Sequence, residues 1–140
     1  MKFEIALERV YPHPIDEVWA GLTTSEAISE WLMETNNFVA QVGHRFEMRC
    51  LDDHGHEDVY RCEVLDLEPP TRMRWSWVLR GNEDRGHTEV EFRLEPADAG
   101  TRLTLWHRGD RDKEMLERFR LGWPDKLEQL AGLLDRSENH

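Results

Sequence analysis

Cysteine is scarce in this sequence, with only Cys50 and Cys62 among 140 residues. Two thiols exclude a disulfide-rich scaffold and a zinc site made of four thiolates. No apolar run approaches the ~20 residues that a membrane helix needs, so we expect no membrane insertion. The first residues also lack the apolar block of a secretory signal, and we therefore expect a cytoplasmic protein with reduced thiols.

Basic residues are also few compared with acidic ones. Lys and Arg together number 18 against 29 Asp and Glu, which gives a formal net charge of −11 at pH 7. Such a surface repels phosphate backbones, so we expect no nucleic-acid partner. Of the 18 basic residues 15 are arginine, a bias typical of a G+C-rich bacterial genome. Linkers and internal repeats are absent as well, which predicts a single domain over residues 1–140 with a core from about 3 to 134.

The first part of the chain predicts one strand followed by two helices. Every second residue near the start is apolar, which indicates a strand over residues 2–11. Helical spacing then recurs twice between residues 15 and 32, after Pro14, and it predicts two short helices. Thr23, with Glu26 three positions later, predicts a capping box for the second of them.

Residues 37–108 alternate with period two between clusters of turn residues, a pattern that predicts an antiparallel meander with one dry and one wet face. In the last hairpin we expect Phe92 opposite Leu105. The same register places Glu89 opposite Arg108, and opposite charges at paired positions support it. The residues expected on the dry face are Phe46, Met48, Cys50, Tyr60, Cys62, Val64, Met73, Trp75, Trp77, Val90, Phe92, Leu94, Leu103, Leu105 and His107.

The last part of the chain predicts a long helix whose apolar stripe covers the dry face of the sheet. Pro124 lacks an amide donor, so we expect a kink or restart near Gly122. The elements together predict an α+β fold in which a curved antiparallel sheet wraps around a long C-terminal helix, with two short helices between the first two strands. The stripe is formed by Met115, Phe119, Trp123, Leu127, Leu130 and Leu134.

The order and spacing of several segments carry a resemblance to known proteins. In them the chain resembles the START-like (SRPBCC, helix-grip) superfamily, and within it the family named after the activator of the ninety-kilodalton heat-shock protein ATPase. The resemblance implies a hydrophobic cavity between the C-terminal helix and the sheet. It implies no single reaction, because members include lipid and hormone carriers, polyketide cyclases and co-chaperones. The segments are Val18–Trp31, the turn at Gly43, Val64–Pro70, Gly100–Leu105 and Gly122–Trp123 with Leu127 and Leu130.

The inward residues favour recognition over chemistry, because they are mostly apolar with a few polar groups. We therefore expect the protein to bind a small hydrophobic or aromatic ligand, lipid-like or polyketide-like, with no cofactor. A solid core without a cavity is the alternative. The side chains expected to line the cavity are Trp31, Phe46, Tyr60, Trp75, Trp77, Phe92, Leu105, His107, Met115, Phe119 and Trp123.

Two other functions stay open. A cyclase- or hydrolase-type enzyme would use His107 and Tyr60, although His107 also fits a buried histidine satisfied by a backbone carbonyl. An ATPase-activator-type co-chaperone, or another partner-regulating module, would need an exposed apolar patch. Trp106, expected on the wet face, can seed such a patch or a homodimer contact.

Two further clusters bear on chemistry. Residues 52–58 gather two histidines and several carboxylates, a set able to bind a divalent ion, but a flexible hairpin tip argues against it and we predict no metal site. Cys50 and Cys62 can be neighbours on adjacent strands, where a disulfide would need Cα atoms within ~7 Å. In a reducing compartment we expect two small buried hydrophobic side chains instead.

Overall fold

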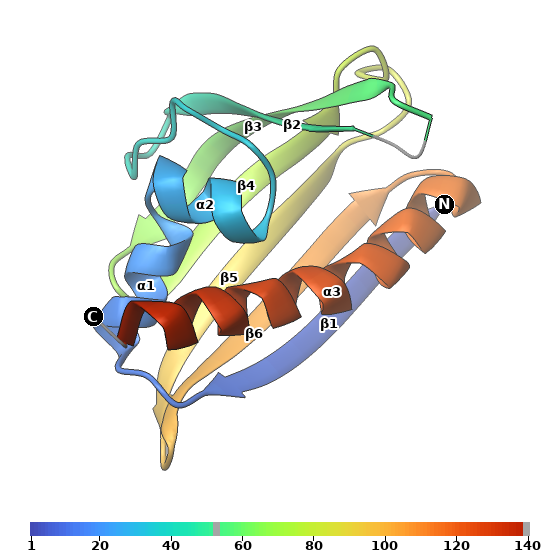
Figure 1. Cartoon of the computed structure of the whole chain (residues 1–140). Coiled ribbons are helices and arrows are strands. Elements are labelled where there is room, and N and C mark those ends of the chain that lie inside the picture. Colours follow the sequence, from blue (N-terminus) through green and yellow to red (C-terminus); the bar gives the residue numbers. More distant parts are fainter. Residues whose placement is uncertain (52–53, 139–140) are drawn as a thin grey trace.

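The computed structural model describes residues 1–51 and 54–138 and shows a curved antiparallel sheet held by one long helix (Figure 1). The sheet has the spatial order β1-β6-β5-β4-β3-β2, so each hairpin is formed by consecutive strands and β1 pairs with the last strand. This architecture confirms the predicted α+β helix-grip fold. The strands are β1 (Lys2–Tyr11), β2 (Arg45–Leu51), β3 (Glu57–Glu68), β4 (Arg72–Leu79), β5 (Thr88–Ala97) and β6 (Gly100–Asp110).

Three helices lie on one side of the sheet: α1 (Ile15–Leu22), α2 (Ser25–Trp31) and α3 (Lys113–Glu138). In Figure 1, α3 crosses the sheet diagonally from the end of β6 toward α1. Both short helices pack against α3, so the three together cover the inner face. Within residues 1–51 and 54–138, no helix is long and apolar enough to cross a membrane.

The start of α2 differs from the prediction by one residue. Thr24 is the N-cap, and its Oγ1 accepts a hydrogen bond from the Ala27 amide at 3.2 Å. Thr23 Oγ1 instead donates to the Trp19 carbonyl at 2.8 Å and belongs to the end of α1. The predicted capping box of Thr23 with Glu26 is therefore wrong, because two adjacent threonines serve two different helix ends.

Pro124 does not divide the long helix. α3 runs without interruption from Lys113 to Glu138, so the predicted restart near Gly122 is wrong. Proline removes the donor that would reach the Arg120 carbonyl, but Pro124 and Arg120 are both exposed. Water can therefore satisfy that carbonyl, and the helix keeps its course on the solvent side.

The inner face of the sheet is dry, as predicted. All fifteen residues expected on it are buried except the half-buried Cys50, and the six stripe residues of α3 are buried against them. The register of the last hairpin is confirmed, with Phe92 opposite Leu105 and Glu89 opposite Arg108. The alternation of side chains thus fixes which residues can face a ligand.

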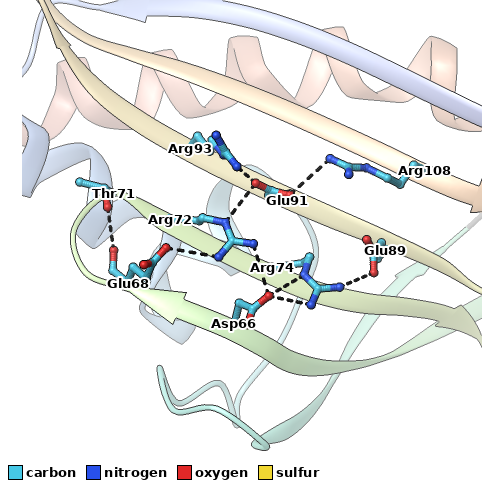
Figure 2. Close-up of polar contacts among 9 residues, drawn as sticks. All are labelled: Asp66, Glu68, Thr71, Arg72, Arg74, Glu89, Glu91, Arg93 and Arg108. Carbon is cyan, nitrogen blue, oxygen red and sulfur yellow. Dashed lines mark hydrogen bonds and ion pairs between the residues drawn. The ribbon is translucent and has the colours of Figure 1, made fainter.

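The outer face of the sheet is organised around a buried carboxylate, Glu91 (Figure 2). Glu91 Oε2 accepts hydrogen bonds from Arg93 Nε at 2.7 Å and Arg72 Nε at 3.2 Å, and Oε1 accepts from Arg108 Nη2 at 3.3 Å. Burial raises the pKa of Glu91, but the hydrogen bonds and charges of Arg93 and Arg72 outweigh it, so the pKa lies below the ordinary range of a glutamate. Strands β4, β5 and β6 therefore share one carboxylate.

Glu89 forms a different ion pair from the one that the pairing of β5 with β6 suggests. Although it lies opposite Arg108, its Oε2 accepts from Arg74 Nη1 at 2.6 Å, while Arg108 turns to Glu91. Arg74 Nε also donates to Asp66 Oδ2 at 2.8 Å, which extends the network to β3 (Figure 2). Long guanidinium side chains reach diagonal neighbours, so strand register alone does not predict ion pairs.

Trp106 lies on the outer face as predicted, but it does not form an apolar patch. Its ring is half-buried, and the guanidinium carbons of Arg93 and Arg108 lie 5.4 and 5.8 Å from the ring centroid. This arrangement places both cations within cation–π range of the indole. The structure therefore does not support Trp106 as the centre of an exposed apolar patch for partner binding.

We predict that Glu91→Gln destabilises the protein by about 1–3 kcal/mol, because three arginines lose their shared carboxylate. The matched change Glu95→Gln, at an exposed residue that pairs with Arg102, should cost less than ~1 kcal/mol. Urea unfolding measures both. Because the pKa of Glu91 is lowered by folding, its contribution is present at neutral pH and lost as the pH falls through that lowered pKa. Equal effects of the two substitutions, or no convergence of Glu91→Gln with the wild type in acid, would contradict this assignment.

Candidate functional site

A cavity of about 150 Å³ lies where α3 meets the β2–β4 half of the sheet. The segment that follows α2 closes one side of it. The strands contribute Cys50, Tyr60 and Trp77, one each from β2, β3 and β4. The full lining comprises Leu32, Met33, Cys50, Tyr60, Trp77, Arg118, Phe119, Gly122, Trp123 and Lys126.

One face of α3 provides half of this lining, because residues four apart lie on the same side of a helix. Gly122 is central to it: a Cβ atom added there would meet no atom within 4 Å. The missing side chain leaves room between Phe119 and Trp123 on the helix and the indole of Trp77 on the sheet. Arg118 and Lys126 stand one turn to either side of the glycine.

The size of the cavity sets what it can hold. A volume of about 150 Å³ accommodates one benzene-sized ring, whereas sites for drug-sized ligands usually measure ~300–1,000 Å³. A larger ligand therefore places one ring or chain inside and leaves the rest at the surface, or it requires α3 to move outward.

The predicted wall residues divide into three groups in the structure. Tyr60, Trp77, Phe119 and Trp123 line the cavity. His107 lies behind it, and Met115 lines a neighbouring pocket. The remaining five form the packed core away from the cavity: Trp31, Phe46, Trp75, Phe92 and Leu105.

Six lining residues were not predicted. Of these, Gly122 could have been identified from the sequence. Glycine does not stabilise a helix, so a glycine inside an amphipathic helix indicates either an empty space beside the helix or the close approach of another segment. The six are Leu32, Met33, Cys50, Arg118, Gly122 and Lys126.

A chain of hydrogen bonds behind the cavity fixes His107. Trp123 Nε1 donates to His107 Nδ1 at 2.9 Å, and His107 Nε2 lies 3.0 Å from Thr88 Oγ1. Thr88 Oγ1 in turn donates to the Trp77 carbonyl at 2.7 Å. Nδ1 must therefore be the acceptor and Nε2 the donor, which assigns one tautomer. Burial lowers the pKa of His107 to about 3, so the imidazole is neutral at physiological pH.

The indole of Trp77 contrasts with that of Trp123. Trp77 Nε1 is buried, and no acceptor for it is found among the described residues; the same holds for Trp75 Nε1 in the core. A buried donor without an acceptor costs about 1–3 kcal/mol, so such groups are rare in folded proteins. Trp77 is therefore a cavity-lining residue with an unsatisfied polar group.

Tyr60 gives the cavity a second polar group. Its ring centroid lies 5.2 Å from that of Trp77, and Trp77 lies 5.5 Å from Trp123, so three aromatic rings follow one another along the wall. Burial raises the pKa of Tyr60 to about 12, although the charge of Arg118 opposes the shift. The phenol is therefore protonated and able to donate or accept a hydrogen bond.

The two cysteines do not lie next to each other. The register places Cys62 opposite Phe46 and Cys50 opposite Asp58, so the thiols are separated by four residues along the ladder, roughly 13 Å. That spacing exceeds the ~7 Å limit for a disulfide, and the predicted proximity is wrong. Cys62 is buried in the core, and burial raises the pKa of its thiol well above the ordinary value.

The acidic hairpin tip at residues 52–58 lies partly outside the described residues, because Asp52 and Asp53 belong to neither range. In residues 1–51 and 54–138 no group of three histidine, cysteine, aspartate or glutamate side chains is arranged to hold a metal ion.

Solved structures share this architecture over nearly the whole chain. Protein MLL2253 from Mesorhizobium loti is 34% identical, with a TM-score of 0.84, over 96% of this chain and 98% of that chain. CV1439 from Chromobacterium violaceum is 26% identical with a TM-score of 0.85, over 94% of this chain and 96% of that one. CalU16 from Micromonospora echinospora is 28% identical with a TM-score of 0.77, over 95% of this chain and 76% of that one.

A search of curated proteins finds no match. A family model provides the assignment, and it agrees with the resemblance carried by the segments between Val18 and Leu130. Residues 12–135 match the family described as activator of Hsp90 ATPase homolog 1-like protein, and the chain belongs to that family.

Proposed function

We propose that the protein binds a small hydrophobic or aromatic ligand in the cavity between α3 and the sheet. One observation carries the proposal: a cavity of benzene size is lined by aromatic side chains, and one of them, Trp77, has a buried indole N–H with no acceptor among the described residues. Apolar walls with one or two placed polar groups are typical of small-molecule sites.

The geometry suggests how such a ligand lies. Its ring or chain end fills the space over Gly122, where three aromatic rings supply the contacts. An acceptor atom on the ligand takes the hydrogen bond of Trp77 Nε1, and the phenol of Tyr60 lies on the same wall. Lipid-like and polyketide-like molecules both combine an apolar body with such oxygen atoms.

The arrangement gives little support to the cyclase or hydrolase alternative. A general base needs a free nitrogen within hydrogen-bond reach of the substrate. Both nitrogens of His107 are already engaged, by Trp123 and Thr88, and the ring is not part of the cavity lining. His107 positions Trp123 in this proposal and takes no proton. The co-chaperone alternative rests on the family description, and nothing in this cavity bears on it.

Filling the cavity provides the most direct test. We predict that Gly122→Leu weakens binding of indole or toluene at least about tenfold, because the new side chain occupies the ligand's space. Gly132→Leu is the matched control, since it changes another glycine of α3 outside the cavity lining. Isothermal titration and tryptophan emission measure the binding. If the wild-type protein binds no apolar probe, the cavity is too tightly closed and the proposal fails.

Two tryptophan substitutions separate the roles of the two indoles. Trp77→Phe and Trp123→Phe remove the same volume, but only Trp123→Phe leaves His107 Nδ1 without its donor. We predict that Trp123→Phe lowers the free energy of unfolding by about 1–2 kcal/mol more than Trp77→Phe does. Trp77→Phe should weaken a ligand that carries an acceptor and leave toluene unaffected. Equal destabilisation in urea would contradict the assigned hydrogen bonds.

The neutral state of His107 predicts a dependence of stability on pH. Because folding lowers the pKa to about 3, the unfolded chain binds a proton below pH ~6.5 that the folded chain does not. Stability contributed by this residue is therefore full above that pH and declines as the pH falls toward 3. The wild type should lose about 2 kcal/mol more than His107→Gln between pH 8 and pH 5. An NMR titration showing an imidazolium at pH 5 would contradict the assignment.

A further inference from the structure

A second pocket lies beside the cavity, where the β4–β5 loop meets the start of α3. Its volume is about 170 Å³. Three arginines line it: Arg85 from the loop, Arg111 from the β6–α3 junction and Arg118 from α3. Arg118 also lines the first cavity, so the two spaces adjoin at this residue. The other lining residues are Leu79, Asn82, Asp112, Glu114 and Met115.

Arg111 is the unusual member of this pocket, because its side chain is only 5% exposed. Its carboxylate partner is Asp112, at 3.5 Å, and Asp112 is itself 55% exposed. The buried Nε has no hydrogen-bond partner among the described residues. A buried guanidinium is normally compensated by a close carboxylate and by several hydrogen bonds, whereas Arg111 has one loosely placed carboxylate and an Nε without a partner.

The backbone holds Arg111 in place. Its amide donates to the Met1 carbonyl at 3.1 Å, and its carbonyl accepts from the N-terminal ammonium of Met1 at 3.0 Å. The side chain passes the backbone of Gly86, where a Cβ atom would lie 3.7 Å from the Arg111 Cδ. The backbone of Arg111 is therefore anchored to the N-terminus, and its side chain packs beside Gly86.

The charges in and around the pocket leave room for an anion. Arg118 is paired with Asp58, with Nη2 and Oδ2 2.9 Å apart. Asp112 and Glu114 also line the pocket, but both are exposed and can stay hydrated. Arg85 forms no ion pair in the described part of the chain and is exposed at the rim. Of the three guanidiniums, only that of Arg118 has a carboxylate within hydrogen-bond distance in the described part of the chain; that of Arg111 has only the exposed Asp112 at 3.5 Å.

We propose that this pocket binds the carboxylate of an amphipathic ligand whose apolar part occupies the adjoining cavity, an inference that rests on the proposed function. A guanidinium presents paired N–H groups that match the two oxygens of a carboxylate, and such charge-assisted hydrogen bonds are stronger than neutral ones. Arg111 and Arg85 bind the carboxylate, and Arg118 lines both spaces. The ligand class is therefore an aromatic or fatty acid, in preference to a neutral hydrocarbon or ester.

The test compares acids with neutral analogues. Phenylalkanoates of increasing chain length and the matching primary amides are titrated into the wild-type protein by calorimetry, with Arg Nε–Hε NMR signals observed in parallel. We expect the best acid to bind about tenfold or more tightly than its amide and to shift the Arg111 signal. Arg111→Met should remove this advantage while leaving affinity for the amide unchanged.

Matched variants keep the result interpretable. Arg120→Met removes the same charge from an exposed position of α3 and should preserve the preference for the acid. Arg85→Met changes an exposed loop residue, so it tests the pocket even if Arg111→Met fails to fold. It should reduce the preference for the acid by severalfold.

The outcomes separate the two proposals. If acids and amides bind equally and Arg111→Met changes neither, the anion pocket is overturned while the cavity proposal stands. If acetate alone shifts the Arg111 signal but no phenyl compound binds more tightly than acetate, the pocket binds anions yet its link to the cavity is overturned. If neither acids nor amides bind, the anion pocket is overturned, and the titration with indole and toluene decides the cavity proposal separately.

Discussion

The whole structure depends on one mismatch of width: a single helix must cover the inner face of a six-stranded sheet. Neighbouring strands lie about 4.8 Å apart, whereas a helix with its side chains is only about 10–12 Å across. α3 therefore covers part of the face, and α1, α2 and the segment after them cover the rest. The cavity lies at the seam between these covers, where α3, Leu32 and Met33 meet above β2, β3 and β4.

Some polar groups near this seam have hydrogen-bond partners and others do not. Trp123, His107 and Thr88 form a closed chain of hydrogen bonds that ends on the carbonyl of Trp77, so the back of the seam is rigid and neutral. The Trp77 indole N–H and the Arg111 Nε, in contrast, lack acceptors among the described residues. Both residues line a pocket, Trp77 the cavity and Arg111 its neighbour, and a ligand there is the proposed source of the missing partners.

The sequence predicted the sheet better than the site. Period-two alternation determines which face a strand residue occupies, and for that reason the burial of Phe92 and His107 and the pairing of β5 with β6 could be foreseen. Alternation does not tell a packed side chain from one that lines a cavity, because that depends on where a helix far along the chain lies. Arg111 carried no periodic signal, since it sits between β6 and α3, and an arginine is expected in water until its surroundings are known.

A substitution at Gly122 can change which ligand fits the cavity without changing the fold. The strands, their register and the arginine network on the outer face involve other residues, so the depth of the cavity can change through one position on α3 without disturbing them. Alanine, valine or leucine there would shrink the available space stepwise. Homologous proteins can therefore change their ligand preference through substitutions of this one residue while the fold stays the same. A binding site made only of residues that stabilise the fold does not allow this.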